Sequence, residues 1–154
     1  ERIAQAPRLY PSVEYIQEGY RRSVCGVDSI YYEMIPIDNF IGTGQWISDE
    51  FNEIVVGSQI ANDLNLGVYN YNDFLLVKTI EKSPRGLGIF NPFRTKKTIV
   101  SGIFSVGEEF DGKYLFSNIT LARNLLQIPE NKYSYLYVNS VNNVSSCSSN
   151  FRVL

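Results

Sequence analysis

The chain has 154 residues, the length of one globular domain or of two small lobes that share a boundary. Hydrophobic residues make up 44% and charged residues 19%, which is ordinary globular usage and excludes a disordered chain. Fourteen Lys and Arg residues against sixteen Asp and Glu residues give a net charge of −2, which argues against a nucleic-acid-binding protein.

The residue types needed for most enzyme and metal chemistry are scarce. The sequence has no histidine, which excludes His-dependent triads and imidazole metal sites. Its two cysteines, Cys25 and Cys147, are too few for a four-thiolate zinc site and too far apart for a CxxC redox motif. We expect two separate structural thiols, while one disulfide between them stays open. Accordingly we expect no enzyme, no metal and no cofactor.

The sequence gives no sign of a membrane span or a secretion signal. No run approaches the ~18 apolar residues that a membrane-spanning helix requires. The chain begins at Glu1 without a signal peptide. We expect a soluble segment of a longer protein.

The first third of the chain is rich in residues that favour β-strands. Segment 13–20 contains Val, Tyr and Ile in near alternation, and segment 23–27 continues the strand-like character. Segment 30–37 is another apolar, aromatic stretch, which ends at a proline and an Asp-Asn pair. Segment 40–45 contains two glycines and is predicted to be a flexible connection.

The clearest local pattern predicts a strand, a short helix and a second strand. Segment 53–57 is an apolar strand closed by glycine, and Ser58 is predicted to cap the following helix. Ile60, Ala61 and Leu64 fall on one face at helical spacing. Segment 74–77 is the second strand.

The last third is predicted to contain three strands and a second helix. Segment 98–104 is a strand, 108–112 a turn and 114–116 another strand. Ser117 or Asn118 is predicted to cap a helix that Pro129 ends, and 133–139 alternates as a strand would. These faces predict a core of Ile54, Val56, Ile60, Leu64, Leu76, Ile99, Ile103, Leu115 and Leu125.

Residues 78–97 differ from everything around them. They hold six of the fourteen basic residues and one acid, a local charge of +5. In the middle of the segment glycine and proline prevent a long regular element, and large apolar residues lie there: Leu87, Ile89, Phe90 and Phe93. The segment is predicted to be a long loop or hairpin arm. Its apolar residues either cover the protein's own core or form a partner surface, because exposed aromatic residues and arginine supply interface energy.

Other candidate sites have simpler explanations. Glu108, Glu109 and Asp111 resemble paired catalytic carboxylates, but sequence neighbours in a turn are expected to be solvated. Gly-x-Gly pairs at 42–44 and 86–88 lack the rest of a phosphate-binding motif and are interpreted as turn glycines. The glycosylation sequons at Asn118 and Asn143 are of a kind that is common by chance.

Five short motifs resemble, in order, segments in the extracytoplasmic domains of lipoprotein-releasing ABC transporter permeases. The resemblance runs from about residue 13 to residue 138 and extends to the wider MacB/LolC/LolE/FtsX permease group. The motifs are Val-Cys-Gly-Val-Asp at 24–28, Glu-Ile-Val-Val-Gly and the following helix at 53–66, Asn-Asp-Phe-Leu-Leu at 72–76, Val-Ser-Gly-Ile-Phe-Ser-Val-Gly at 100–107 with Phe110-Asp111, and Leu-Ala-Arg at 121–123.

The resemblance implies an α+β fold with a MacB-like periplasmic core. A porter-like lobe at 1–32 and 133–154 would be interrupted by a Sabre-like lobe of strands and short helices at 33–132. The arm at 82–95 would protrude from the Sabre-like lobe, where the family's carrier-binding permease places a hairpin that engages the carrier.

The resemblance also implies a function and partners. The parent protein would be a bacterial inner-membrane permease that releases lipoproteins and hands them to a periplasmic carrier, with this domain facing the periplasm. Its partners would be the carrier, the lipoprotein substrate, and, through the membrane part, an ATPase subunit and a second permease copy, with no nucleic acid. The implied carrier contacts are Pro84, Arg85, Gly86, Leu87, Gly88, Ile89, Phe90, Asn91, Pro92 and Phe93.

A second interpretation keeps the same permease group with another role. The domain would then serve efflux with an adaptor protein, or the control of a cell-wall hydrolase. Neither role needs a protruding basic and aromatic hairpin at this position, so the arm distinguishes the two interpretations. A stand-alone enzyme is the least favoured class, because no nucleophile–base pair can be assembled.

Overall fold

The computed structural model describes the backbone of residues 2–6, 13–15, 20–48, 52–72, 74–80 and 93–139. It describes the side chains of residues 22–48, 52–72, 74–79 and 94–134. In this part of the chain no helix is long and apolar enough to cross a membrane.

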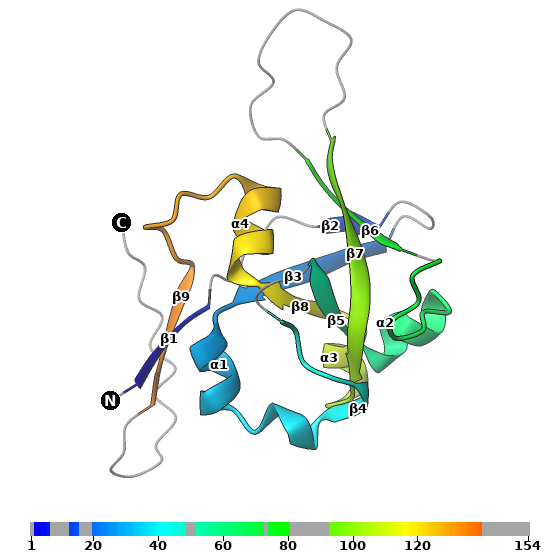
Figure 1. Ribbon diagram of the computed structural model, residues 1–154, viewed down its shortest axis with the longest axis horizontal. Helices are drawn as coiled ribbons and strands as arrows, with labels where there is room; N and C mark the ends of the chain where they lie inside the picture. Colours follow the sequence, from blue (N-terminus) through cyan, green and yellow to red (C-terminus); the bar gives the residue numbers. More distant parts are fainter. Residues whose placement is uncertain are drawn as a thin grey trace, which may run out of the picture.

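Seven strands form one central sheet, in the order β4-β7-β5-β8-β3-β2-β6 (Figure 1). The long strand β7 also pairs with β6, so the strands from β7 to β6 in this order close into a ring, and β4 pairs with β7 outside it. Strands β1 and β9 form a separate antiparallel pair beside α1. The strands are β1 (Arg2–Ala6), β2 (Val13–Tyr15), β3 (Tyr20–Val27), β4 (Ile41–Gly44), β5 (Glu53–Gly57), β6 (Leu75–Ile80), β7 (Phe93–Phe104), β8 (Tyr114–Asn118) and β9 (Tyr135–Asn139).

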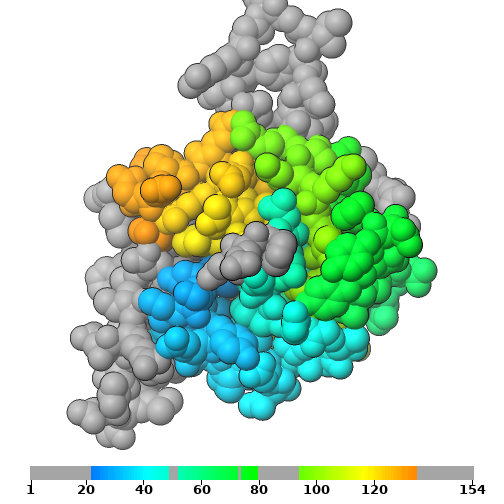
Figure 2. All heavy atoms as spheres, in the orientation of Figure 1, coloured from blue at the N-terminus to red at the C-terminus, as the bar shows by residue number. Residues whose placement is uncertain are grey.

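Short helices cover both faces of the sheet. They are α1 (Ser29–Met34), the 3₁₀ turn η1 (Ile37–Asn39), α2 (Ser58–Asp63), α3 (Glu108–Asp111) and α4 (Ile119–Leu126). Every residue of β5 and of β8 is buried, which is expected only when both faces are packed. In the space-filling view (Figure 2), α2 and the green segment after it lie on the opposite side of the molecule from the orange residues that follow α4.

Alternation along the strands produces two apolar clusters. Val24, Ile54, Val56 and Leu115 face the first cluster, which α2 and α4 cover with Ile60, Leu121 and Leu125. The intervening residues face the second, which is mainly aromatic: Cys25, Val27, Val55, Phe104, Tyr114 and Phe116, with Tyr31, Ile41, Trp46, Ile47 and Phe110 packed against them.

The structure confirms the predicted cap of α4. The Asn118 side chain accepts the Leu121 backbone N–H at 2.7 Å and donates to the Ser48 carbonyl at 3.2 Å. Its buried amide is therefore not a glycosylation acceptor in the folded protein. The helix ends before Pro129, because Gln127 adopts a left-handed conformation at φ 54°.

Three local predictions are corrected. Segment 30–37 contains helix α1, whose N-cap is Asp28, and segment 40–45 contains strand β4 rather than a flexible connection. The cap of α2 is Gly57 and not Ser58. The Ser58 hydroxyl instead donates to Asp111 at 2.9 Å, so it links α2 to α3.

The predicted core is confirmed in five positions and wrong in one. Ile54, Val56, Ile60, Leu115 and Leu125 are buried, while Leu64 and Ile103 are partly buried and pack against them. Ile99 is also partly buried. Leu76 is 36% exposed, because β6 turns its neighbours Leu75 and Val77 to the core.

The predicted division into two lobes remains a prediction. Its first boundary falls inside α1, and β3 on one side of it pairs in parallel with β8 on the other. The prediction of two separate thiols at Cys25 and Cys147 also stays untested, because Cys147 lies outside the described residues, while Cys25 is buried in β3.

Candidate partner-binding site

The predicted arm follows a well-defined strand pair. β6 and β7 are antiparallel, with register partners from Leu75 and Thr98 to Ile80 and Phe93. The predicted contacts from Pro84 to Pro92 lie outside the described residues, and Phe93 is described by its backbone alone. The structure therefore describes the foot of the arm.

The outer face of this foot combines apolar and cationic side chains. Phe74 is 40% and Leu76 36% exposed, and Lys97 lies opposite Leu76 in the register. The Lys97 Nζ atom lies 5.8 Å from the centre of the Phe74 ring, within cation–π range. Lys78 and its register partner Thr95 lie beside them. We call the surface formed by Phe74, Leu76, Lys78, Thr95 and Lys97 the hairpin patch.

The inner face of the foot is fixed to the body of the domain. The Thr79 hydroxyl donates to the Leu125 carbonyl at 2.9 Å, and Arg94 donates to the Asn124 carbonyl at 3.3 Å. The Thr98 hydroxyl donates to the Leu75 carbonyl at 2.9 Å. The bonds from Thr79 and Arg94 join the strand pair to the end of α4, and the bond from Thr98 links the two strands to each other, so the hairpin patch has a fixed base.

Arg123 organises the chain after α4. It donates to the Glu130 carbonyl at 2.7 Å, and its guanidinium carbon lies 4.8 Å from the centre of the Tyr133 ring. A polar cavity of about 240 Å³ lies between this turn and Arg94. The two contacts of Arg123 hold the chain after α4 against the helix.

The acidic cluster is only partly the solvated turn that was predicted. Glu108 and Glu109 are exposed, but Asp111 is buried, with 3% of its surface accessible. Burial raises the pKa of Asp111, but the hydrogen bonds to its carboxylate lower it by more, so the net pKa lies below the ordinary value. The donors are the Val106 and Gly107 N–H groups and the Ser58 and Ser105 hydroxyls. Asp111 is thus a structural acceptor.

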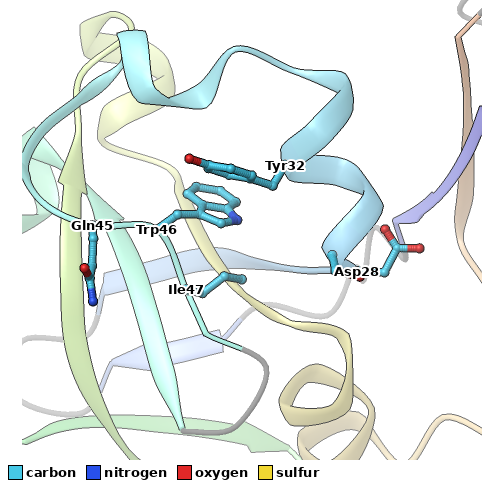
Figure 3. Close-up of a pocket in the computed structure, with 6 residues that line it drawn as sticks. Asp28, Tyr32, Gln45, Trp46 and Ile47 are labelled. Carbon is cyan, nitrogen blue, oxygen red and sulfur yellow. The ribbon is translucent and has the colours of Figure 1, made fainter.

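A polar pocket of about 350 Å³ lies beside α1 (Figure 3). The rings of Tyr32 and Trp46 lie next to each other in it, while the Asp28 carboxylate points away from them. The Tyr32 hydroxyl donates to the Asp38 carboxylate, at 2.7 and 2.8 Å from its two oxygens, and this bond raises the pKa of Tyr32. Among the described residues no cluster of acids and cysteines could hold a metal ion.

The hairpin patch was missed by sequence reasoning, although a signal was present. The run 74–77 is apolar throughout, so its hydrophobicity does not show which residues face outward. Alternate residues of a strand share a face, so Lys78 lies on the same face as Phe74 and Leu76. Because lysine is almost never buried, this face is the one exposed to solvent. Lys97, which completes the patch, comes from the partner strand.

Comparison with known proteins gives a structural match. No protein-family model matches the sequence, and no curated protein does. The structure is similar to the extracellular domain of the noncanonic ABC-type transporter YknZ from Gram-positive bacteria, with a TM-score of 0.59 and 10% identity. The similarity covers 88% of this chain and 63% of that one.

The match confirms the predicted fold class. The chain is an α+β domain that shares its fold with the extracellular domain of an ABC-type transporter.

Proposed function

We propose that this chain is the periplasm-facing domain of an ABC transporter permease of the bacterial inner membrane, which hands lipoproteins to a periplasmic carrier. Two observations support the permease: the fold shared with a transporter's extracellular domain, and the order of the family motifs in the sequence. The hairpin patch carries the finer proposal, because it presents apolar and cationic side chains at the foot of the arm.

In this function the domain binds and transmits force, and carries out no chemistry itself. The +5 charge of residues 78–97 speeds the encounter with an acidic carrier surface, and salt weakens this effect. Affinity comes from buried apolar area at Ile89, Phe90 and Phe93 and on the patch. The bonds from Thr79 and Arg94 to α4 connect the arm to the body of the domain.

The remaining partners belong to the parent permease. An ATPase subunit and a second permease copy would act through its membrane part, and the lipoprotein substrate would pass from the permease to the carrier. The alternative is a related permease for efflux or for control of a cell-wall hydrolase. The fold suits that alternative equally, since YknZ is described only as a noncanonic ABC-type transporter.

The test is a calorimetric titration of the domain with the lipoprotein carrier of the same organism. Phe90→Ala, Phe93→Ala and Leu76→Ala should each weaken binding by about tenfold, which corresponds to about 1.4 kcal/mol. Ile30→Ala is the matched control, because Ile30 is equally exposed, at 38%, but lies on α1 away from the hairpin. Equal affinity of all four variants and the wild type would overturn the assignment of the contacts. Absence of carrier binding by the wild type would favour the alternative permease.

A further inference from the structure

A small apolar pocket opens on the aromatic side of the sheet. Its volume is about 130 Å³, and none of its lining side chains is charged. The rings of Phe104 and Trp46 lie 5.5 and 5.4 Å from that of Phe116, and Phe110 lies 5.8 Å from Phe104. Phe40 and Val106 also line the pocket. We call the site formed by these two residues and by Trp46, Phe104, Phe110 and Phe116 the aromatic pocket.

The aromatic pocket is preformed and accessible. Phe104 and Phe116 come from β7 and β8 and are almost fully buried, so the floor of the pocket belongs to the second core cluster. Phe40 is 38% exposed and Val106 54%, so the mouth is open to solvent. An engineered apolar cavity of about 150 Å³ holds benzene, so this pocket suits one ring or one branched aliphatic side chain.

The surroundings of the aromatic pocket are acidic. Residues 28–46, which supply one wall of the pocket, contain Asp28, Glu33 and Asp38 and no Lys or Arg. The segment 98–116, which supplies the opposite wall, contains Glu108, Glu109 and Asp111 against one base, the exposed Lys113, whose Nζ atom lies 5.3 Å from the centre of the Tyr114 ring. Four of these carboxylates, on the elements that line the pocket, are exposed: Glu33, Asp38, Glu108 and Glu109.

We propose that the aromatic pocket docks a segment of another protein that has one large apolar side chain flanked by lysine or arginine. The apolar group leaves water inside the ring of aromatic side chains, which supplies affinity. The flanking bases meet the acidic rim, which selects the partner and speeds encounter. This site is separate from the hairpin patch and goes beyond the proposed function, since its charge is opposite to that of the arm.

The single tryptophan of the chain makes the proposal directly measurable. Trp46 lines the aromatic pocket, so its fluorescence reports on an occupant. The probe is a capped pentapeptide with one phenylalanine between two pairs of lysines. Two control peptides replace the phenylalanine by alanine, or the lysines by glutamates. The first peptide should give a saturable change in emission, and each control should bind at least about tenfold more weakly.

Two variants separate the apolar and the charged contributions. Val106→Phe should close the mouth and abolish the response, while the double variant Glu108→Gln/Glu109→Gln should weaken binding and reduce its dependence on salt. Leu76→Ala, on the hairpin patch, is the control and should leave the titration unchanged. Urea denaturation of each variant verifies that the fold is intact.

Three results would overturn the proposal. They are the absence of a saturable response to the lysine peptide, equal binding of all three peptides, and unchanged binding by Val106→Phe. A dimer in sedimentation experiments that Val106→Phe dissociates would show that a second copy of this chain, and not another protein, occupies the pocket.

Discussion

Gly26 of β3 lies directly under Ala122 of α4, so closely that a Cβ atom built on the glycine would overlap the Cβ of the alanine. The same atom would lie 3.3 Å from the Ile119 Cα. Because β3 pairs in parallel with β8, and α4 begins directly after β8, this contact sets how close the helix lies to the sheet. Ala122 is fully buried there.

Gly26→Ala should therefore destabilise the fold by about 1–3 kcal/mol, through overpacking. In the background of Ala122→Gly the same substitution should cost much less, because the overlapping methyl group is gone. The four proteins of this cycle are compared by urea denaturation.

The control is Gly67→Ala, since no atom lies within 4 Å of a Cβ at Gly67. It should leave the midpoint nearly unchanged. Equal destabilisation by Gly26→Ala in both backgrounds would show that another contact limits the approach of α4.

A second prediction concerns the two faces of β6. Leu75 is 1% exposed and Leu76 36%, although they are adjacent and chemically identical. Leu75→Ala should lower the free energy of unfolding by about 2–5 kcal/mol, because it leaves a cavity in the core. Leu76→Ala should cost much less, within about 1 kcal/mol. A larger loss for Leu76→Ala than for Leu75→Ala in urea denaturation would mean that the strand turns its other face to the core.

The sequence of β6 predicts a strand but not which of its faces points to the core. The unit β5–α2–β6 was predicted, because a short run of Ile and Val closed by glycine occurs before a helical face. The orientation of β6 was wrong, because four consecutive apolar residues fit either face. Only pairing with β7 and the packing of α4 decide it.

Helix α1 was missed for a different reason. None of its residues is buried, and Ile30, Tyr31 and Tyr32 are types that favour strands. Its local signal is Asp28, whose side chain accepts the Tyr31 backbone N–H at 3.1 Å. Strand β4 is also beyond local reasoning, since its glycines become a strand only through pairing with β7.

The two candidate surfaces also differ in how far the sequence predicts them. The charge of residues 78–97 is visible in the sequence, and so the arm was predicted. The aromatic pocket was not, because Phe40 and Trp46 come from one segment and Phe104 and Phe116 from another. Long-range strand pairing brings these rings together.

A third prediction concerns the cap of α4. Asn118→Ala removes the acceptor for the Leu121 N–H and the donor to the Ser48 carbonyl, and should cost about 1–2 kcal/mol. Asn118→Ser retains a capping oxygen and should recover part of this loss. Thermal denaturation compares the three proteins. If serine is no better than alanine, the contact with Ser48 is the more important of the two.

The last prediction follows from the buried carboxylate of Asp111. Its pKa in the folded protein lies below its ordinary value, since the hydrogen bonds to the ionised form outweigh burial. A depressed folded pKa contributes stability that is fully present above the unfolded pKa, about 3.9, and is lost as the pH falls through the folded value. Wild-type stability should therefore decline in acid partly through this one group.

Asp111→Asn removes that contribution and should destabilise the protein near neutral pH by about 2–4 kcal/mol, because four donors lose a charged acceptor. The difference between wild type and variant should shrink as the pH falls below about 4. Urea midpoints measured across this range test the sign. Glu109→Gln, which changes an exposed carboxylate of the same helix, should leave the neutral-pH midpoint almost unaltered. If the urea midpoints of wild type and Asp111→Asn differ by the same amount at all pH values, the geometry of the Asp111 side chain stabilises the fold and its charge does not.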